Sequence, residues 1–186
     1  MSFQNPGPGF GPVLETERLI LRPPSGEDFD AFAAMMEDGE HVRFVGGQMA
    51  RATAWRVWCT IAGAWMVRGY SMFSVIEKAS GQWVGRIGPW YPEGWPAREV
   101  GWGLSPAATG RGYGVEAAAA CLDYVFDVLG WDDVIHIIDP DNHPSINLAR
   151  RLGSTNRGPT RMPAPFQDAV VDAWGQTAAN WRARRV

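Results

Sequence analysis

The sequence contains only two cysteines, Cys59 and Cys121, among 186 residues. They lie among apolar neighbours on separate predicted helices, so we expect two buried free thiols and not a disulfide framework. The chain also lacks a run of about 18 apolar residues, which excludes a transmembrane helix. Residues 1–12 contain neither a positively charged segment nor an apolar one, unlike a signal peptide. We therefore expect a cytoplasmic protein that does not bind membranes.

The sequence has little excess charge. The formal net charge is −3 and the calculated pI is about 5.6, which argues against a general nucleic-acid-binding surface. The arginines at residues 182–185 are expected to form a solvated tail. The three histidines, His41, His136 and His143, lack the spacing of metal ligands. We therefore expect neither a nucleic-acid partner nor a bound metal.

The length suits one domain, which we place at residues 13–186 after a Pro/Gly-rich tail at residues 1–12. Apolar periodicity predicts strands at residues 13–22, 70–77, 83–89, 100–104, 133–138 and 169–174. Helices are expected after Ser25, at residues 52–68, from Val115 to Leu129, and at residues 145–152. Asp28 is the expected capping partner of Ser25. Strands separated by helices, with a hairpin in the middle, indicate an α/β domain with a mixed sheet.

One apolar stripe is predicted on the helix at residues 52–68. Trp55, Trp58, Ala62 and Trp65 recur at spacings of three, four and three residues. Such a stripe is typical of a face that packs against the core, and it is more often core than a cofactor site.

The most informative stretch is residues 99–120, where an apolar strand runs through a glycine-rich turn into a helix. Gly110, Gly112 and Gly114 stand at every second position of this turn. Glycine lets the backbone approach an anion closely, and the N–H groups at a helix N-terminus bind phosphate. The pattern therefore predicts a phosphate-bearing cofactor.

Three other interpretations of the turn compete with this one. A nucleotide P-loop needs Lys followed by Ser or Thr after the last glycine, and Val115 and Glu116 stand there instead. A dinucleotide-binding fingerprint needs a different glycine spacing in the first strand–helix turn, although Asp132 and Asp133 lie near the right distance for its acidic residue. A purely structural turn also remains open.

The turn resembles the pyrophosphate loop of the GNAT superfamily of N-acetyltransferases, Gln/Arg-x-x-Gly-x-Gly/Ala, especially that of the branch related to RimJ and RimL. The matching segment here begins at Thr109, which departs from the family's Gln or Arg. A second block, residues 139–153, resembles the family's Asn-x-x-Ser-x-x-Leu-x-x-x-x-Gly segment through Asn142, Ser145, Leu148 and Gly153. The resemblance implies a GNAT fold, in which helices flank a mostly antiparallel sheet that is splayed between the fourth and fifth strands.

The resemblance also implies direct transfer of an acetyl group from acetyl-CoA to an amine. The fourth and fifth strands would be residues 100–104 and 134–138, and an N–H group near Trp102 to Leu104 would polarise the thioester carbonyl. The residues expected to contact the cofactor are Trp102, Leu104, Thr109, Gly110, Arg111, Gly112, Tyr113, Gly114, Val115, Asn142, Ser145 and Leu148.

The resemblance suggests two catalytic residues. Glu99 begins the fourth strand and is the candidate base, with a solvated carboxylate or a salt bridge to Arg98 or Arg86 as the alternative. The acid of many relatives is a Tyr, but Ala149 occupies its position here. Ser145 is therefore the candidate proton donor, with a role only in starting its helix as the alternative.

The acceptor is expected to be a protein N-terminus or a small-molecule amine. Its pocket would be built by the first two helices, the loop at residues 90–95 and the segment around Trp174. The alternative function is a non-catalytic acyl-CoA-binding or regulatory module on the same fold. The resemblance leaves a homodimer open, because dimers are common in the family and no segment of the sequence marks an interface.

Overall fold

The computed structural model describes residues 11–184, so residues 1–10 of the predicted tail lie outside the described residues. Within residues 11–184, eight strands form one sheet in the order β1-β2-β3-β4-β5-β6-β8-β7. All neighbouring strands are antiparallel except β5 and β6, which are parallel. The mixed, mostly antiparallel sheet predicted from the sequence is confirmed.

The elements have the following bounds. The strands are β1 (Leu14–Glu15), β2 (Leu19–Arg22), β3 (Phe73–Glu77), β4 (Trp83–Trp90), β5 (Glu99–Leu104), β6 (Asp133–Ile138), β7 (Thr155–Thr160) and β8 (Val171–Thr177). The helices are α1 (Phe29–Glu37), α2 (Arg51–Arg68), α3 (Tyr113–Asp123), α4 (His143–Leu152) and α5 (Ala178–Ala183).

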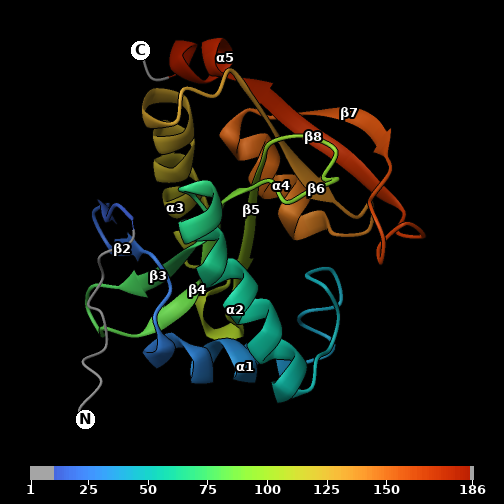
Figure 1. Cartoon of the computed structure of the whole chain (residues 1–186). Helices are drawn as coiled ribbons and strands as arrows, with labels where there is room; N and C mark the ends of the chain where they lie inside the picture. The colour runs from blue at the N-terminus through green and yellow to red at the C-terminus, as the bar shows by residue number, and fades with distance from the viewer. Residues whose placement is uncertain (1–10, 185–186) are drawn as a thin grey trace.

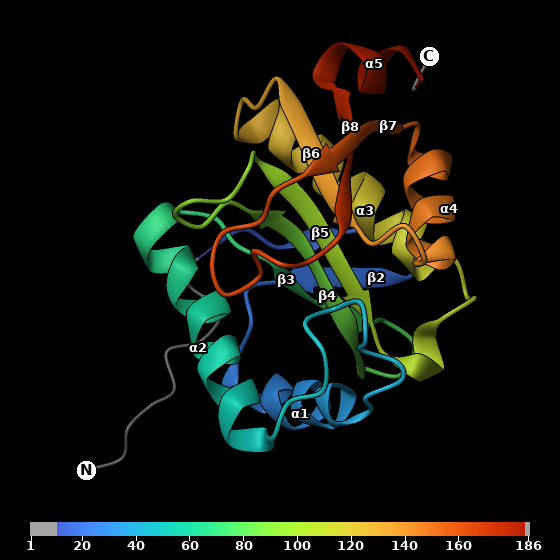
Figure 2. The ribbon, with the colours of Figure 1, turned by 90° about the vertical axis from the view of Figure 1, so that its right-hand side faces the viewer.

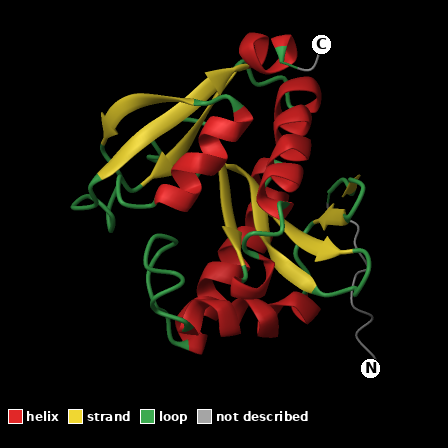
Figure 3. Cartoon of the chain, turned by 180° about the vertical axis from the view of Figure 1, so that it is seen from behind, coloured by secondary structure: helices red, strands yellow, loops and turns green. Residues whose placement is uncertain are grey.

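The sheet falls into two halves, β1 to β5 and β6, β8 and β7, which diverge on either side of the boundary between β5 and β6 (Figures 1 and 3). Helices α1 and α2 lie on one face of the first half, where Phe32 and Trp58 pack against Trp83 of β4. Helix α3 packs on the other face against Val84 and Val100. Helix α4 packs against β6 and β8 of the second half (Figure 2).

The local signals for helix ends agree with the structure. The Asp28 carboxylate accepts a hydrogen bond from the Ser25 backbone N–H at 2.9 Å, which closes the predicted capping box before α1. Gly69 and Gly153 adopt left-handed conformations at the C-terminal ends of α2 and α4, with φ of 76° and 91°.

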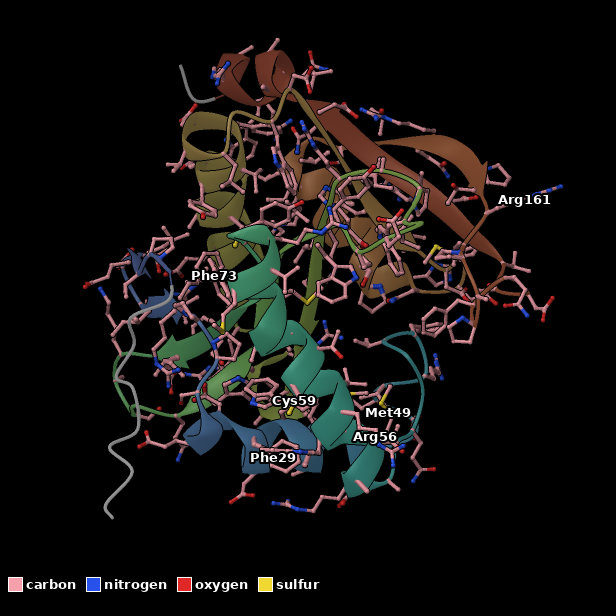
Figure 4. All side chains as sticks on the ribbon, viewed as in Figure 1. Phe29, Met49, Arg56, Cys59, Phe73 and Arg161 are labelled. Atoms are coloured by element: carbon pink, nitrogen blue, oxygen red, sulfur yellow. The ribbon has the colours of Figure 1, made fainter. Side chains whose placement is uncertain are left out.

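Several predictions made from periodicity were wrong. Residues 13–22 form two short antiparallel strands, β1 and β2, because the chain turns back between them. Trp55 is 50% exposed, while Ala54, Trp58, Ile61 and Trp65 form the buried face of α2. Cys59 lies on α2 (Figure 4) and is exposed, whereas Cys121 is buried.

Two elements were missing from the prediction, namely β7 and α5. Arg182 of α5 forms an ion pair with Asp127 at 3.0 Å, and the Arg184 guanidinium donates to the carbonyl of Arg151 at 3.1 Å. The described part of the C-terminal segment is therefore docked on the domain, in contrast to the solvated tail that was expected. Among residues 11–184, none of the helices combines the length and hydrophobicity that a membrane span requires.

Candidate active site

The two central strands separate immediately after they meet. Strands β5 and β6 share one register pair, Glu99 with Ile135, where the Ile135 N–H donates to the Arg98 carbonyl at 2.8 Å. The next N–H along β6, that of Ile137, donates at 3.1 Å to the carboxylate of Glu99. The splay expected between these strands is therefore present, and it leaves one edge of β5 open.

His136 of β6 fills the narrow end of the splay. Its Nδ1 lies 2.6 Å from the Val100 carbonyl, and its Nε2 lies 2.9 Å from Ser154 Oγ. A carbonyl only accepts, so Nδ1 carries the proton and Nε2 accepts from the serine hydroxyl. Burial lowers the pKa of His136 to about 4, so the ring is neutral at physiological pH. The sequence identified no role for this histidine, because a single His within a buried strand carries no spacing signal.

A cavity of about 700 Å³ lies at the C-terminal end of β5, beyond the point where the strands part. It is lined by the end of β5, the glycine turn, the first turns of α3 and α4, and the loop that joins α1 to α2. Of the residues predicted to bind the cofactor, those that line it are Trp102, Leu104, Thr109, Gly110, Gly112, Gly114, Val115, Asn142, Ser145 and Leu148. The fold thus brings together residues from two blocks that are about 30 positions apart in the sequence.

The glycine turn has the geometry that close approach of an anion requires. Gly110 and Gly112 have φ of 79° and 81°, values that L-residues with side chains rarely adopt. A Cβ at Gly114 would lie 2.5 Å from Leu148 Cδ1. Within residues 11–184, the N–H groups of Tyr113, Gly114 and Val115 have no hydrogen-bond acceptor. The N-terminus of α3 therefore fits the diphosphate of coenzyme A.

Two residues of the turn direct their side chains elsewhere. The Arg111 guanidinium forms an ion pair with Glu77 at 2.6 Å, and the buried Tyr113 hydroxyl donates to the same carboxylate. Neither side chain lines the cavity. Their contribution to a cofactor is thus limited to backbone groups, while their side chains fix the turn to the end of β3.

Ser145 is held at the start of α4 by contacts to both of its polar groups. Its backbone N–H donates to Asn142 Oδ1 at 3.2 Å, which makes Asn142 the N-cap of the helix. Its hydroxyl oxygen accepts from the indole Nε1 of Trp102 at 3.2 Å. Because the indole occupies an acceptor site of the oxygen, the hydroxyl proton of Ser145 is available to another group in the cavity.

Glu99 is buried at the apex of the splay, with 6% of its surface exposed. Burial raises the pKa of this carboxyl to about 7, although hydrogen bonds from Ile137 N–H and Trp95 Nε1 and the charge of Arg86 act against the rise. Neither arginine considered from the sequence forms a salt bridge with it among the described residues: Arg98 pairs with Asp132, and Arg86 has no carboxylate within 4 Å. Glu99 lies beside the cavity and does not line it.

The loop between α1 and α2 was not predicted to contribute to the site, yet it forms one wall of the cavity. The residues involved are Asp38, Glu40, His41, Arg43, Phe44 and Val45. His41 Nε2 lies 2.7 Å from the carbonyl of Leu104, the last residue of β5. No pattern marks this loop in the sequence. The residues at 90–95 and Trp174, which were expected to build the acceptor pocket, do not line the cavity.

Comparison with known proteins agrees with this geometry. A family model described as "Acetyltransferase (GNAT) domain" matches residues 18–155. An uncharacterized protein of Bacillus subtilis, YkkB, is 30% identical over 150 residues, which cover 75% of this chain and 83% of YkkB. The uncharacterized N-acetyltransferase p20 of Bacillus licheniformis is 26% identical over 165 residues, covering 87% of this chain and 93% of p20.

Solved structures show the same architecture. An acetyltransferase from Agrobacterium tumefaciens superposes with a TM-score of 0.79 at 30% identity, covering 89% of this chain and 94% of that one. The aminoglycoside acetyltransferase AAC(6')-Ib, solved in complex with coenzyme A, superposes with a TM-score of 0.73 at 17% identity, covering 90% and 99% of the two chains. The second likeness concerns the fold alone.

Proposed function

The chain belongs to the GNAT family of N-acetyltransferases, in its RimJ/RimL-like branch, and on that premise we propose that Glu99 and Ser145 are its catalytic base and acid. The family uses acetyl-CoA, which supplies an acetyl thioester. We further propose that the acceptor is a primary amine that attacks the thioester carbonyl directly. The observation that carries the proposal is the cavity that joins the end of β5, beyond its last pairing with β6, to the N-termini of α3 and α4.

The attacking amine has to be neutral. Reference pKa values of about 7.7 for an α-amino group and about 10.4 for Lys mean that most of either amine is protonated near neutral pH. A group that accepts the proton accelerates the reaction most when its own pKa lies near the working pH. Glu99, with a pKa of about 7, meets this condition. Because its carboxylate lies beside the cavity, the proton would reach it through a bridging water.

The leaving thiolate needs a proton in turn. As the new N–C bond forms and the C–S bond breaks, the electron pair of that bond passes to sulfur. Ser145 lines the cavity, and its oxygen already accepts from Trp102. The serine hydroxyl would therefore donate its proton to the sulfur and regain a proton through water from Glu99, which had taken one from the amine. The products would be an N-acetyl amine and the free thiol.

The open edge of β5 supplies donors for the thioester oxygen. The N–H groups of Trp102 and Leu104 face the gap, because the alternate residues of β5 pair with β4, and no acceptor for them occurs among the described residues. Backbone donors held rigidly in a sheet stabilise negative charge that develops on a carbonyl oxygen. This polarising role is the one that the family resemblance predicted for the strand.

The test is a thiol-release assay with acetyl-CoA and a panel of amines, which should include peptides, amino acids, polyamines and aminoglycosides. We expect acceptor-dependent thiol release with at least one class of amine, and N-acetylation of that amine by mass spectrometry. The control is the same assay with Glu93→Gln, which alters a fully exposed carboxylate away from the site. Tight binding of coenzyme A without turnover of any acceptor would contradict the proposal.

A further inference from the structure

Arg86 is the only charged residue of β4, a strand that otherwise reads Trp-Val-Gly-x-Ile-Gly-Pro-Trp. It lies on the face of the sheet that α1 and α2 cover, where its guanidinium stacks 6.0 Å from the ring of Phe32. Its Nε has no hydrogen-bond partner, and its Nη1 contacts only the sulfur of Met72. Among residues 11–184, no carboxylate lies within 4 Å of it.

A cation in such surroundings is unusual. Burial lowers the pKa of Arg86 to about 10, so the side chain still carries its charge at neutral pH. A guanidinium removed from water without a counter-ion is costly, and proteins normally pair it with a carboxylate or a phosphate. Guanidinium and carboxylate groups form two parallel hydrogen bonds, which gives the pair both strength and direction. Within residues 11–184, Glu99 acts on the Arg86 charge across the sheet, but no carboxylate forms a direct pair with the guanidinium, which leaves its hydrogen-bond donors free for an anion of a ligand.

Arg86 and Glu99 share this face of the sheet. The register pairs Arg86 with Gly103, Gly88 with Gly101, and Trp90 with Glu99. The two charged residues are thus separated along the strands by glycines, and no β4 or β5 side chain stands between them. A Cβ at Gly101 would lie 3.0 Å from Met72 Cε and 3.4 Å from Glu99 Oε1.

Gly88, Gly101 and Gly103 form a glycine floor between Arg86 and Glu99, and this floor adjoins the cavity. Gly103 lines the cavity, and a Cβ there would lie 3.1 Å from Val45 and 4.0 Å from Arg86 Cγ. The floor is covered by Met72 and by Val45 of the loop between α1 and α2. Arg86 does not line the cavity itself, so a ligand that reaches its guanidinium has to move the Met72 side chain, which is unbranched and adapts its shape readily.

We propose that Arg86 binds a carboxylate of the acceptor, so that the acceptor is a small amine that carries a carboxylate, of which a free amino acid is the simplest case. The inference rests on the proposed function and narrows its substrate class. The carboxylate is held by Arg86, and the amine lies over the glycine floor on the side of Glu99. A protein N-terminus presents a peptide carbonyl in place of the carboxylate and leaves Arg86 unpaired.

The test compares amino acids with their own carboxamides, which keep the amine and lose only the negative charge. For the wild-type protein we expect kcat/KM to be about 10- to 100-fold higher for the acid than for the amide. The amide cannot form the charged, hydrogen-bonded pair with Arg86, and the loss of one such pair predicts a difference of this size. In Arg86→Gln the ratio of the two kcat/KM values falls to about 1, while any change that acid and amide share reports the shift in the pKa of Glu99 that loss of the Arg86 charge causes. Arg86→Lys keeps the charge but loses the two parallel hydrogen bonds, so its preference for the acid over the amide should be intermediate.

The matched control is Arg98→Gln, which removes an exposed arginine that pairs with Asp132 and should leave the preference intact. Binding is measured separately by calorimetry, with the same acids and amides titrated into protein saturated with coenzyme A. Thermal unfolding verifies that each variant is folded. Arg86→Gln is expected to unfold at a temperature close to that of wild type, because it removes a cation that has no directly paired carboxylate among residues 11–184.

The outcomes separate this inference from the proposed function. Equal use of acids and amides by the wild-type protein overturns the carboxylate assignment and leaves acetyl transfer standing. An equal fall for both in Arg86→Gln also overturns it, because Arg86 would then act through the charge of Glu99. If no amine reacts, the proposed function fails, and calorimetry still decides whether Arg86 binds the acid in preference to the amide.

Discussion

The indole Nε1 of Trp95 donates a hydrogen bond to Glu99 Oε2 at 2.6 Å, while the N–H of Ile137 donates to Oε1 of the same carboxylate. Both contacts favour the ionised form, and both oppose the rise in pKa that burial causes. The loop that precedes β5 and the first free N–H of β6 therefore hold one carboxylate from two sides. Its pKa near 7 is a balance between burial and these donors.

Replacement of Trp95 by Phe should disturb that balance in a defined direction. The loss of one donor to the ionised form raises the pKa of Glu99 above 7. The rate of acetyl transfer against pH should keep its plateau at high pH and move its lower limb to higher pH. Trp55→Phe, which changes a half-exposed indole on α2, should leave the profile unchanged. A fall in the plateau without a shift of the limb would contradict this account.

Glu99→Gln removes the proposed base without a change in shape. The effect expected for loss of a positioned base is a fall in kcat of roughly 100-fold or more, with little change in the KM for acetyl-CoA. The limb near pH 7 in the wild-type profile should vanish from the remaining activity. Steady-state kinetics from pH 5.5 to about 9 would measure both effects. A variant that keeps the wild-type limb would show that another group titrates there.

The same substitution should change how stability depends on pH. The carboxyl of Glu99 has a pKa of about 7 when folded, against an ordinary 4.5, so the folded protein holds a proton that the unfolded chain releases. The stability that this proton contributes is fully present below about pH 4.5 and is lost as pH rises through 7. Between those limits the wild-type free energy of unfolding should fall, relative to Glu99→Gln, by on the order of 3 kcal/mol. Denaturant unfolding at several pH values tests this. His136 titrates in both proteins, so its opposite contribution cancels in the comparison.

Ser145→Ala should slow the release of the thiol. We expect kcat to fall about 10-fold, at the weak end of the range for general acids, because water can replace the serine as a proton donor. Acetyl-CoA binding should change little, since Asn142 still caps α4. The control is Ser105→Ala, a serine before the glycine turn. Unchanged turnover in Ser145→Ala would remove the serine from the mechanism.

Gly114→Ala tests the glycine turn against a second glycine that has room for a side chain. The new methyl group would lie 2.5 Å from Leu148 Cδ1, so we expect a weaker affinity for coenzyme A and a loss of about 1–3 kcal/mol of stability. A Cβ at Gly63, within α2, meets no atom within 4 Å. Gly63→Ala should therefore gain about 0.5–1 kcal/mol from helix propensity and leave activity intact. Calorimetric titration with coenzyme A and thermal unfolding measure both effects.

The parts of the fold that the sequence predicted are those with a strong local signal. The hairpin of β3 and β4 has a turn that contains Gly81, and Gly69 and Gly153 mark the ends of their helices. Strand β7 was missed because it reads Thr-Asn-Arg-Gly-Pro-Thr, which contains a glycine, a proline and no large apolar residue. It is a strand because β8 supplies its partner, and periodicity does not encode that pairing.

The site, too, could be predicted only where a local sequence pattern marks it. The glycine turn and the Asn142 block follow the family pattern, so the sequence located the cavity. The wall that contains His41 is brought there by tertiary packing alone. Arg86 did have a signal, since it is a lone charge within an apolar strand. That signal became informative only when the structure showed which carboxylates lie too far away to pair with it.

The splay between β5 and β6 has a consequence for aggregation. An open strand edge inside a protein is a template on which another polypeptide can add a strand. Here His136 occupies the Val100 carbonyl at one end, and His41 occupies the Leu104 carbonyl at the other. Between them remain the two groups of Trp102 and the N–H of Leu104, too few for the repeating pairs of a β-ladder. The edge can therefore hold a short amide-bearing chain and still resist edge-to-edge association with a second protein.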